Sequence, residues 1–286
     1  MPVSGFKQGI LQGVKTGFGK SRIKSGLLGG IKEKVSMYTK MIDPTLVRGN
    51  DAPLLVWHAD TCTYTAGTNV VTALTDQSSG GRNATVQGAS IPFVPKGINN
   101  YRGYIATTVG TGFFHSNTLT GLNECTIMMV VKGSPVVSRR LFSCENSVGT
   151  SQGDLYCSTK LSPYRYSVTQ IGSPTANTIV YDSMPGLIEN NWCLVTAKFR
   201  LASPSGYSNS MHFAVNGNSQ TEEISTTVTY TAGATYGNAV FWVCNNNSIA
   251  TGGASFGSVA VWPTWLNESD TLLYENYFRS YYSYNF

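Results

Sequence analysis

The chain has 286 residues, of which 41% are hydrophobic and 12% charged, so it is long enough to bury a core of its own. Its net charge of +5 hides two parts: residues 1–50 hold nine lysines or arginines against two acids, and residues 51–286 hold eleven against thirteen. No run of 18 apolar residues occurs, which excludes a membrane-spanning helix. We therefore expect a basic arm, residues 1–50, on a globular body, residues 51–286.

Glycine and apolar residues recur in the arm at a spacing of four. On a helix they would form two adjacent stripes, with Lys7 and Lys15 on the other side and a second amphipathic stretch beginning near Arg22 and Lys24. The two stripes consist of Gly5, Phe6, Gly9, Ile10, Gly13, Val14, Gly17 and Phe18. Each glycine costs about 1 kcal/mol relative to alanine in a helix. We expect an arm that is disordered when free and orders on docking; the alternative is a flexible basic tail with accidental spacing.

Targeting and nucleic-acid roles are not expected of the arm. Lys7, Lys15 and the glycines interrupt every apolar stretch that might serve as a secretory signal. Few aromatic residues lie among the basic ones and the body is slightly acidic, which argues against nucleic acid. Contact with a membrane surface is the lesser alternative to docking on a protein.

From residue 51 onward, short β-branched and aromatic runs alternate with Gly, Asn, Ser and Pro clusters, which predicts an antiparallel sandwich or barrel. The predicted strands are Leu54–Trp57, Val70–Thr75, Tyr104–Thr107, Thr126–Lys132, Arg140–Cys144, Tyr166–Gln170, Cys193–Arg200, Met211–Val215, Ala239–Cys244 and Ser258–Trp262. Asn216–Gly217 predicts a two-residue hairpin turn. We interpret Gly110–Thr111–Gly112 as another hairpin turn, since no helix is predicted after it.

One helix is predicted in the body, at its end. Asn267 or Ser269 offers an N-cap, acids follow in the first turn, and apolar residues then recur at helical spacing. The aromatic tail 281–286 is either part of this buried clasp or an exposed patch. Trp57, Trp192, Trp242 and Trp262 are expected in the core.

The six cysteines include no C-x-x-C pair and the chain has only three histidines, so no metal site and no cofactor are expected. Cys125, Cys193 and Cys244 lie in apolar, strand-like runs, where a cysteine behaves as a small buried hydrophobic residue. Disulfides are not expected in a chain made in a reducing cytoplasm.

Seven phrases, in order, resemble the concanavalin A-like lectin/glucanase sandwich in its laminin-G-like, jelly-roll form. They are LLVWHAD, VVTALTDQSSGGRNATVQ, RGYIATTVGTGFF, CTIMMVVKG, NNWCLVTAKF, MHFAVNG and FGSVAVWPTWLNESDTLLYENYFRSYY, spanning roughly residues 52–283. The second is similar to a recurring turn that precedes a short strand in this family. The resemblance implies an all-β, two-sheet antiparallel sandwich with a short C-terminal helix.

Catalysis is not expected. Glycosidases of this family place their carboxylates on one strand in an E-x-D-x-x-E pattern, and a pair of carboxylates must flank the scissile bond. The chain lacks that pattern, and its acids lie in turn-like or helix-start contexts. Nucleophile-elbow, phosphate-loop and H-E-x-x-H motifs are absent as well.

A sugar site needs only an aromatic plate and a few polar groups. Tyr164, Arg165 and Tyr166, together with Asn245 and Asn246, are the candidate glycan-binding residues. The alternative for these tyrosines is an ordinary surface or core position.

A basic arm joined to such a sandwich resembles virion accessory proteins of tailed bacteriophages. The resemblance implies a non-enzymatic structural component of the head, collar or tail, made in the host cytoplasm, present in many copies or as a homo-oligomer, and docked on other virion proteins through the arm. The alternative function is a carbohydrate-binding adhesin that attaches to host-surface glycans.

Overall fold

The computed structural model describes residues 41–88, 90–99, 102–108, 110–115, 118–132, 139–146, 155–160, 165–171, 176–182, 191–200, 211–219, 239–244 and 254–283. The compact unit to which nearly all of these belong runs from Ile42 to Phe286. The arm residues before Met41 lie outside the described ranges, so the predicted boundary between arm and body stays a prediction.

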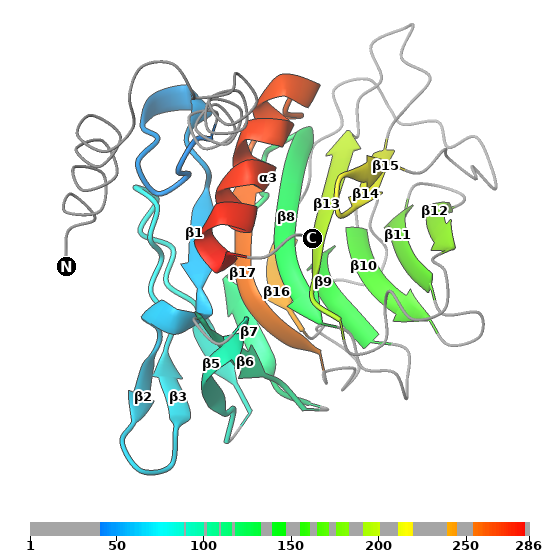
Figure 1. The fold of residues 1–286 in the computed structure, drawn as a ribbon. Helices are drawn as coiled ribbons and strands as arrows, with labels where there is room; N and C mark the ends of the chain where they lie inside the picture. Colours follow the sequence, from blue (N-terminus) through cyan, green and yellow to red (C-terminus); the bar gives the residue numbers. More distant parts are fainter. Residues whose placement is uncertain are drawn as a thin grey trace, which may run out of the picture. The chain divides into compact units, whose positions relative to one another are not determined.

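Two antiparallel sheets make up the unit, with a separate ribbon of two strands (Figure 1). The first sheet contains β1 (Leu55–His58), β5 (Phe93–Ile98), β6 (Arg102–Ala106), β8 (Glu124–Lys132), β13 (Cys193–Arg200), β14 (Met211–Val215), β15 (Asn218–Ser219) and β17 (Ser255–Trp262). The second contains β4 (Thr85–Gln87), β7 (Gly112–His115), β9 (Arg139–Asn146), β10 (Leu155–Lys160), β11 (Arg165–Ile171), β12 (Ala176–Asp182) and β16 (Ala239–Val243). The ribbon pairs β2 (Thr63–Thr65) with β3 (Val70–Ala73). The predicted all-β sandwich is confirmed.

Strands adjacent in sequence do not always pair. In the first sheet the order is β15, β14, β13, β8, β17, β6, β5. β1 is not in this order: it pairs with residues 258–261 of β17, next to the positions 255 and 256 that pair with β6. β6 and β7 belong to different sheets, so Gly110–Thr111–Gly112 lies in a crossover between sheets. The prediction of a hairpin turn there was wrong, because both flanking strands find their partners elsewhere in the chain: β6 pairs with β5 and β17, and β7 with β4 and β16.

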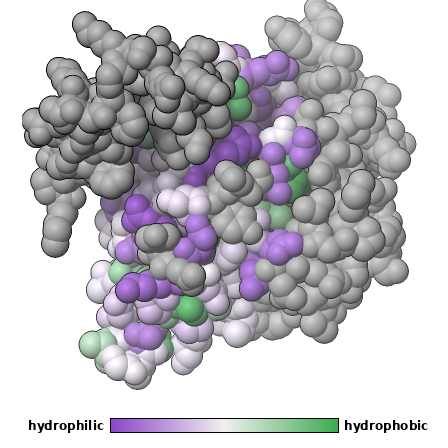
Figure 2. All heavy atoms as spheres, viewed as in Figure 1, coloured by the Kyte–Doolittle hydropathy of each residue, from purple (hydrophilic) through white to green (hydrophobic). Residues whose placement is uncertain are grey.

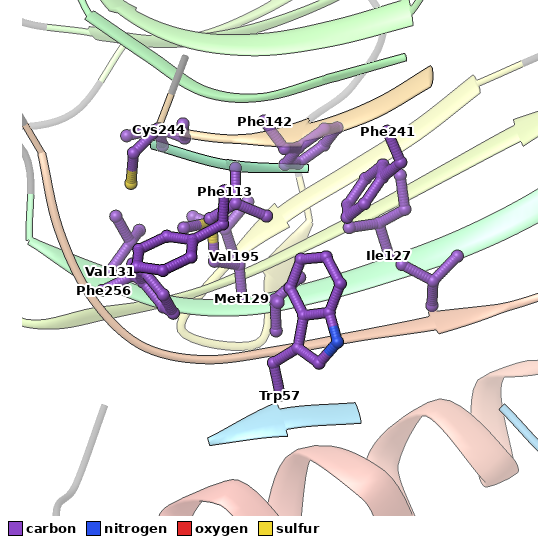
Figure 3. Packing of buried hydrophobic residues seen from close by; sticks show 14 of the residues in the cluster. Trp57, Phe113, Ile127, Met129, Val131, Phe142, Val195, Phe241, Cys244 and Phe256 are labelled. Carbon is purple, nitrogen blue, oxygen red and sulfur yellow. The ribbon is translucent and has the colours of Figure 1, made fainter. Parts of the chain in front are cut away.

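The larger hydrophobic core lies between the two sheets, and we call it the intersheet core (Figure 3). Ile127, Met129 and Val131 of β8 face it, while Met128 and Val130 alternate to the opposite face and are equally buried. A strand that is covered on both faces needs apolar residues at every position. This is why β8 reads as an almost continuous apolar run.

The opposite face of the first sheet is covered by helix α3 (Glu268–Tyr282) (Figure 1). Figure 2 shows hydrophilic residues along the surface where α3 lies in Figure 1. The second hydrophobic cluster, the helix-side core, fills the space between sheet and helix, and it consists of Val56, Ile98, Met128, Val130, Trp192, Leu194, Ala260, Trp262, Leu266, Tyr274, Tyr277, Phe278 and Tyr282. Tyr282 is fully buried. At this position the aromatic tail is therefore part of the buried helical clasp and not an exposed patch. No helix in the described ranges is long and apolar enough to cross a membrane.

The start of α3 is set by its sequence. Asn267 is the N-cap: its Oδ1 accepts a hydrogen bond from the Asp270 amide at 2.8 Å. Glu268 and Asp270 lie in the first turn and Arg279 in the last, where the helix dipole favours each charge. The predicted helix is confirmed, with asparagine as its cap.

The Asn216–Gly217 hairpin is also confirmed. Both residues have positive φ, 56° and 80°, and Val215 pairs directly with Asn218 across the turn. A Cβ at position 217 would lie 2.8 Å from Nη2 of Arg279, so glycine also lets the turn approach α3.

Four tryptophans and three cysteines occupy the expected places. Trp57 and Trp262 are fully buried, and Trp242 and Trp192 are 5% and 7% exposed. Cys125, Cys193 and Cys244 are at most 1% exposed. Burial raises the pKa of Cys244 to about 12, which keeps its thiol neutral and unreactive.

Candidate functional site

Trp265 is the only one of the five tryptophans that is not buried. It lies in the link between β17 and α3, and its side chain is partly exposed. A large aromatic side chain that is not used in a core is the residue type that most often presents a flat apolar surface to a ligand. The signal was available in the sequence: in VWPTWLN, Trp265 follows Pro263 and precedes the cap of α3. Trp265 was not predicted as a site residue, because it lies outside every predicted strand.

The chain around Trp265 is held on both sides. Thr126 Oγ1 donates to the carbonyl of Thr264 at 2.7 Å and accepts from the amide of Leu266 at 3.0 Å. Lys198 Nζ donates to the carbonyl of Leu266 at 2.7 Å. Three hydrogen bonds from β8 and β13 therefore fix the backbone immediately before and after Trp265, so this segment would need little ordering on binding a ligand.

An ion pair lies beside the indole. The guanidinium carbon of Arg200 is 4.7 Å from the centre of the Trp265 ring, a distance at which the cation attracts the ring electrons. Arg200 Nε donates to Glu124 Oε2 at 2.9 Å, and the two residues are direct partners across β13 and β8. Their side chains are 17% and 27% exposed. Both therefore offer polar atoms to solvent next to the ring.

Two further basic residues lie on β13 and β14, and one of them, Lys198, is buried with its Nζ 5.9 Å from the centre of the Trp265 ring. Lys198 is 3% exposed, and burial lowers its pKa, although Glu268 and Glu275 act in the opposite direction. His212 of β14 is the cross-strand partner of Lys198. Burial, together with the charge of Lys198, lowers the pKa of His212 below 6.5. His212 is therefore mostly neutral at pH 7. We call Glu124, Lys198, Arg200, His212 and Trp265 the Trp265 platform.

The Trp265 platform has the composition of a small sugar-binding surface. An indole packs against the apolar face of a pyranose ring, and a neighbouring guanidinium and carboxylate can donate to and accept from hydroxyl groups. The platform lies at one end of the first sheet, where β8 begins and β13 and β17 end.

A second polar cluster has the residue types of a nucleophilic pair but not its accessibility. His58 Nδ1 lies 2.6 Å from Ser258 Oγ. However, the two residues are only 2% and 0% exposed and lie under α3, so a substrate cannot reach the serine. We assign this pair a structural role.

Within the described ranges, no group of three or more His, Cys, Asp or Glu side chains is placed to hold a metal ion. The buried carboxylates serve the fold. Asp76 accepts hydrogen bonds from Val56, Ser78 and Arg82, and Glu275 from Thr196.

Most of the predicted site residues lie outside the described ranges. These are the arm residues Gly5, Phe6, Lys7, Gly9, Ile10, Gly13, Val14, Lys15, Gly17, Phe18, Arg22 and Lys24, and the candidate glycan residues Tyr164, Asn245 and Asn246. Arg165 and Tyr166 begin β11: Arg165 pairs with Lys160 and Asp182, and Tyr166 with Thr159 and Tyr181. Both proposed surfaces stay predictions.

No family model matches the sequence, and no curated protein matches it. Solved structures do match. The binding domain of botulinum neurotoxin serotype D has 13% identity and a TM-score of 0.51 over 78% of this chain and 50% of its own. The serotype D ligand-binding domain in complex with N-acetylneuraminic acid has 14% identity and a TM-score of 0.52, with coverage of 78% and 50%.

A third match is a botulinum neurotoxin type C structure, whose cell entry is described as dependent on two ganglioside molecules. It has 12% identity and a TM-score of 0.52, over 82% of this chain and 52% of that one. The chain thus spans about half the length of the neurotoxin chains that it matches. The likeness shows a shared fold: the described body is an antiparallel β-sandwich.

Proposed function

We propose that the sandwich is a non-catalytic carbohydrate-binding module and that the Trp265 platform is its sugar-contacting surface. The observation that carries the proposal is the partly exposed indole of Trp265, which is flanked by the Arg200–Glu124 ion pair. The backbone on either side of it, at Thr264 and Leu266, is fixed by three hydrogen bonds from the side chains of Thr126 and Lys198. The similar neurotoxin domains, one of them in complex with N-acetylneuraminic acid, support the ligand class. Of the two predicted functions, the glycan-binding alternative is better supported than the virion role.

A glycan array with the full chain tests this function. We expect at least one class of glycan to bind, and the Trp265→Ala variant to bind it at least tenfold more weakly, because loss of ring stacking removes about 1.4 kcal/mol or more. Trp265→Phe should retain part of the affinity since it keeps an aromatic face. Affinity would be measured by titration calorimetry with the best glycan of the array.

Tyr64→Ala is the matched control. Tyr64 is 42% exposed and lies on the β2–β3 ribbon, outside the Trp265 platform. Its replacement should leave binding unchanged. If no glycan binds, the proposed function is wrong; if Tyr64→Ala weakens binding and Trp265→Ala does not, the function stands and the platform is the wrong surface.

The same array distinguishes the platform from the surface predicted from sequence. If Tyr164→Ala or Tyr166→Ala weakens binding and Trp265→Ala does not, the site includes the start of β11 and the loop before it. Both sets of variants are needed because the platform and β11 belong to different sheets.

The structural virion role is a second candidate, and the charge contrast between residues 1–50 and the body favours it. It predicts that deleting residues 2–40 leaves a folded sandwich with an unchanged thermal midpoint that no longer joins its assembly. The measurement is the copy number of the truncated protein in purified particles. Incorporation at the normal copy number would refute docking through the arm.

A further inference from the structure

Helix α3 is connected to the first sheet by a buried polar network as well as by apolar packing. The network consists of His58, Asp60, Ser258, Tyr277, Tyr281 and Tyr282, and we call it the latch network. It joins β1, the 3₁₀ turn η2 (Ala59–Thr61) and β17 to the second half of α3.

His58 is the centre of the latch network. Its Nδ1 lies 2.6 Å from Ser258 Oγ, which is in turn hydrogen-bonded to the hydroxyl of Tyr282. Its Nε2 lies 3.3 Å from the Tyr277 hydroxyl, and its ring stacks on Tyr281 with centroids 4.4 Å apart. The three tyrosines, Tyr277, Tyr281 and Tyr282, all belong to α3, so His58 and Ser258 connect the sheet to the helix. The imidazole is 2% exposed, so a positive charge on it would have almost no water around it.

The charged groups around His58 come from three elements. Asp60 of η2 and Asp43, which precedes η1 (Gly49–Asp51), favour a charged imidazole, whereas Arg102 of β6 disfavours it. Arg102 is itself paired with Asp60 at 2.9 Å and donates to the carbonyl of Tyr281 at 3.0 Å. Burial outweighs both acids and lowers the pKa of His58 from 6.5 to about 4. The imidazole is therefore neutral at pH 7 while α3 is packed on the first sheet, which we call the docked state of the helix.

The latch network is separate from the core that holds the sheets together. The intersheet core lies on one face of the first sheet and the helix-side core on the other, and all four helix residues in the two clusters belong to the helix-side core. Gly257 allows the close approach of α3, since a Cβ there would lie 2.7 Å from the Tyr282 hydroxyl. No buried residue of α3 therefore belongs to the intersheet core.

We propose that α3 is an acid-sensitive latch: protonation of His58 releases the helix from the first sheet while the two sheets remain packed. The docked state binds this proton more weakly than the released state, in which His58 meets water. Stability of the docked helix is therefore complete above about pH 6.5 and is lost as the pH falls toward 4. The opening equilibrium constant should rise about 50-fold between pH 7 and pH 4.5.

Hydrogen exchange on the full chain, at pH 7 and pH 4.5 and corrected for intrinsic rates, tests the latch. We expect the amides of Tyr274–Phe278 to open more readily than those of Ile127–Met129 at both pH values, and their opening constant to rise about 50-fold at pH 4.5. Equal opening constants for the helix and β8 would overturn the proposal, because the helix would then leave only with the whole sandwich. So would an opening constant that does not change with pH.

Two variants assign the effect to His58. His58→Gln should abolish the pH dependence of the α3 opening constant, and His115→Gln, on β7 of the second sheet, should retain it. A His58→Gln protein that keeps the dependence would refute the assignment. If this variant does not fold, an NMR titration of the wild-type imidazoles decides: His58 should titrate well below 6.5, and a midpoint near 6.5 in the folded protein would overturn the latch.

Discussion

Asp76→Ala should lower the free energy of unfolding by about 3–5 kcal/mol, because it leaves several hydrogen-bond donors without an acceptor. The carboxylate, 8% exposed, accepts from the amide of Val56 at 2.8 Å, from the amide and hydroxyl of Ser78 at 2.9 Å each, and from the amide of Arg82 at 2.7 Å. These bonds connect the 76–82 turn to the edge of β1. Urea unfolding followed by tryptophan fluorescence would measure the loss.

Two variants separate this role from a general effect of charge. Asp76→Asn keeps one acceptor oxygen and should cost less than the alanine variant. Asp51→Ala removes an exposed carboxylate from the 3₁₀ turn η1 and should change the unfolding free energy by less than about 0.5 kcal/mol. A loss below about 1 kcal/mol for Asp76→Ala would contradict the role assigned to the carboxylate.

Trp57→Ala should cost about 3–5 kcal/mol, since it opens a large cavity in the intersheet core. The indole is fully buried, its ring centre is 6.2 Å from that of Phe241 in the opposite sheet, and its Nε1 donates to the carbonyl of Arg82 at 2.8 Å. Trp57→Phe fills most of the cavity but loses this hydrogen bond, so a smaller loss of about 1–2 kcal/mol is expected. Denaturant unfolding would again supply the free energies.

Asp76 and Trp57 both bind Arg82, one through its amide and the other through its carbonyl. The Asp76→Ala/Trp57→Phe double variant should therefore lose less than the sum of the single losses, by at least about 0.5 kcal/mol. Strict additivity would show that the two side chains stabilise the turn independently.

Features decided by a few neighbouring residues were predictable from sequence. Asn216–Gly217 suits a turn with two positive φ angles, and Asn267 caps a helix whose first turn is acidic. Each of the ten predicted strands overlaps an observed one. β5 was missed because Pro95 and Gly97 disfavour a strand. It is tolerated at the edge of the first sheet, where its register with β6 shifts between Val94 and Ile98.

Features that depend on distant residues were not predictable. The crossover at Gly110–Gly112 follows from the choice of partners by β6 and β7, which sit in different sheets. The latch network joins His58 to Ser258, 200 positions away, and no local pattern marks either residue. For the Trp265 platform, the position of Trp265 between strand and helix was visible, but its contact with Arg200 required the pairing of β8 with β13.

The attachment of Ile42 to α3 has a mechanical consequence. Its amide donates to the carbonyl of Leu273 at 3.3 Å, and Val47 packs against the helix-side core. Tension applied to the chain ahead of Ile42 would therefore reach the helix before it reached any strand. A pulling force would therefore load the contact between residues 42–47 and the helix before it loaded the hydrogen bonds between the strands.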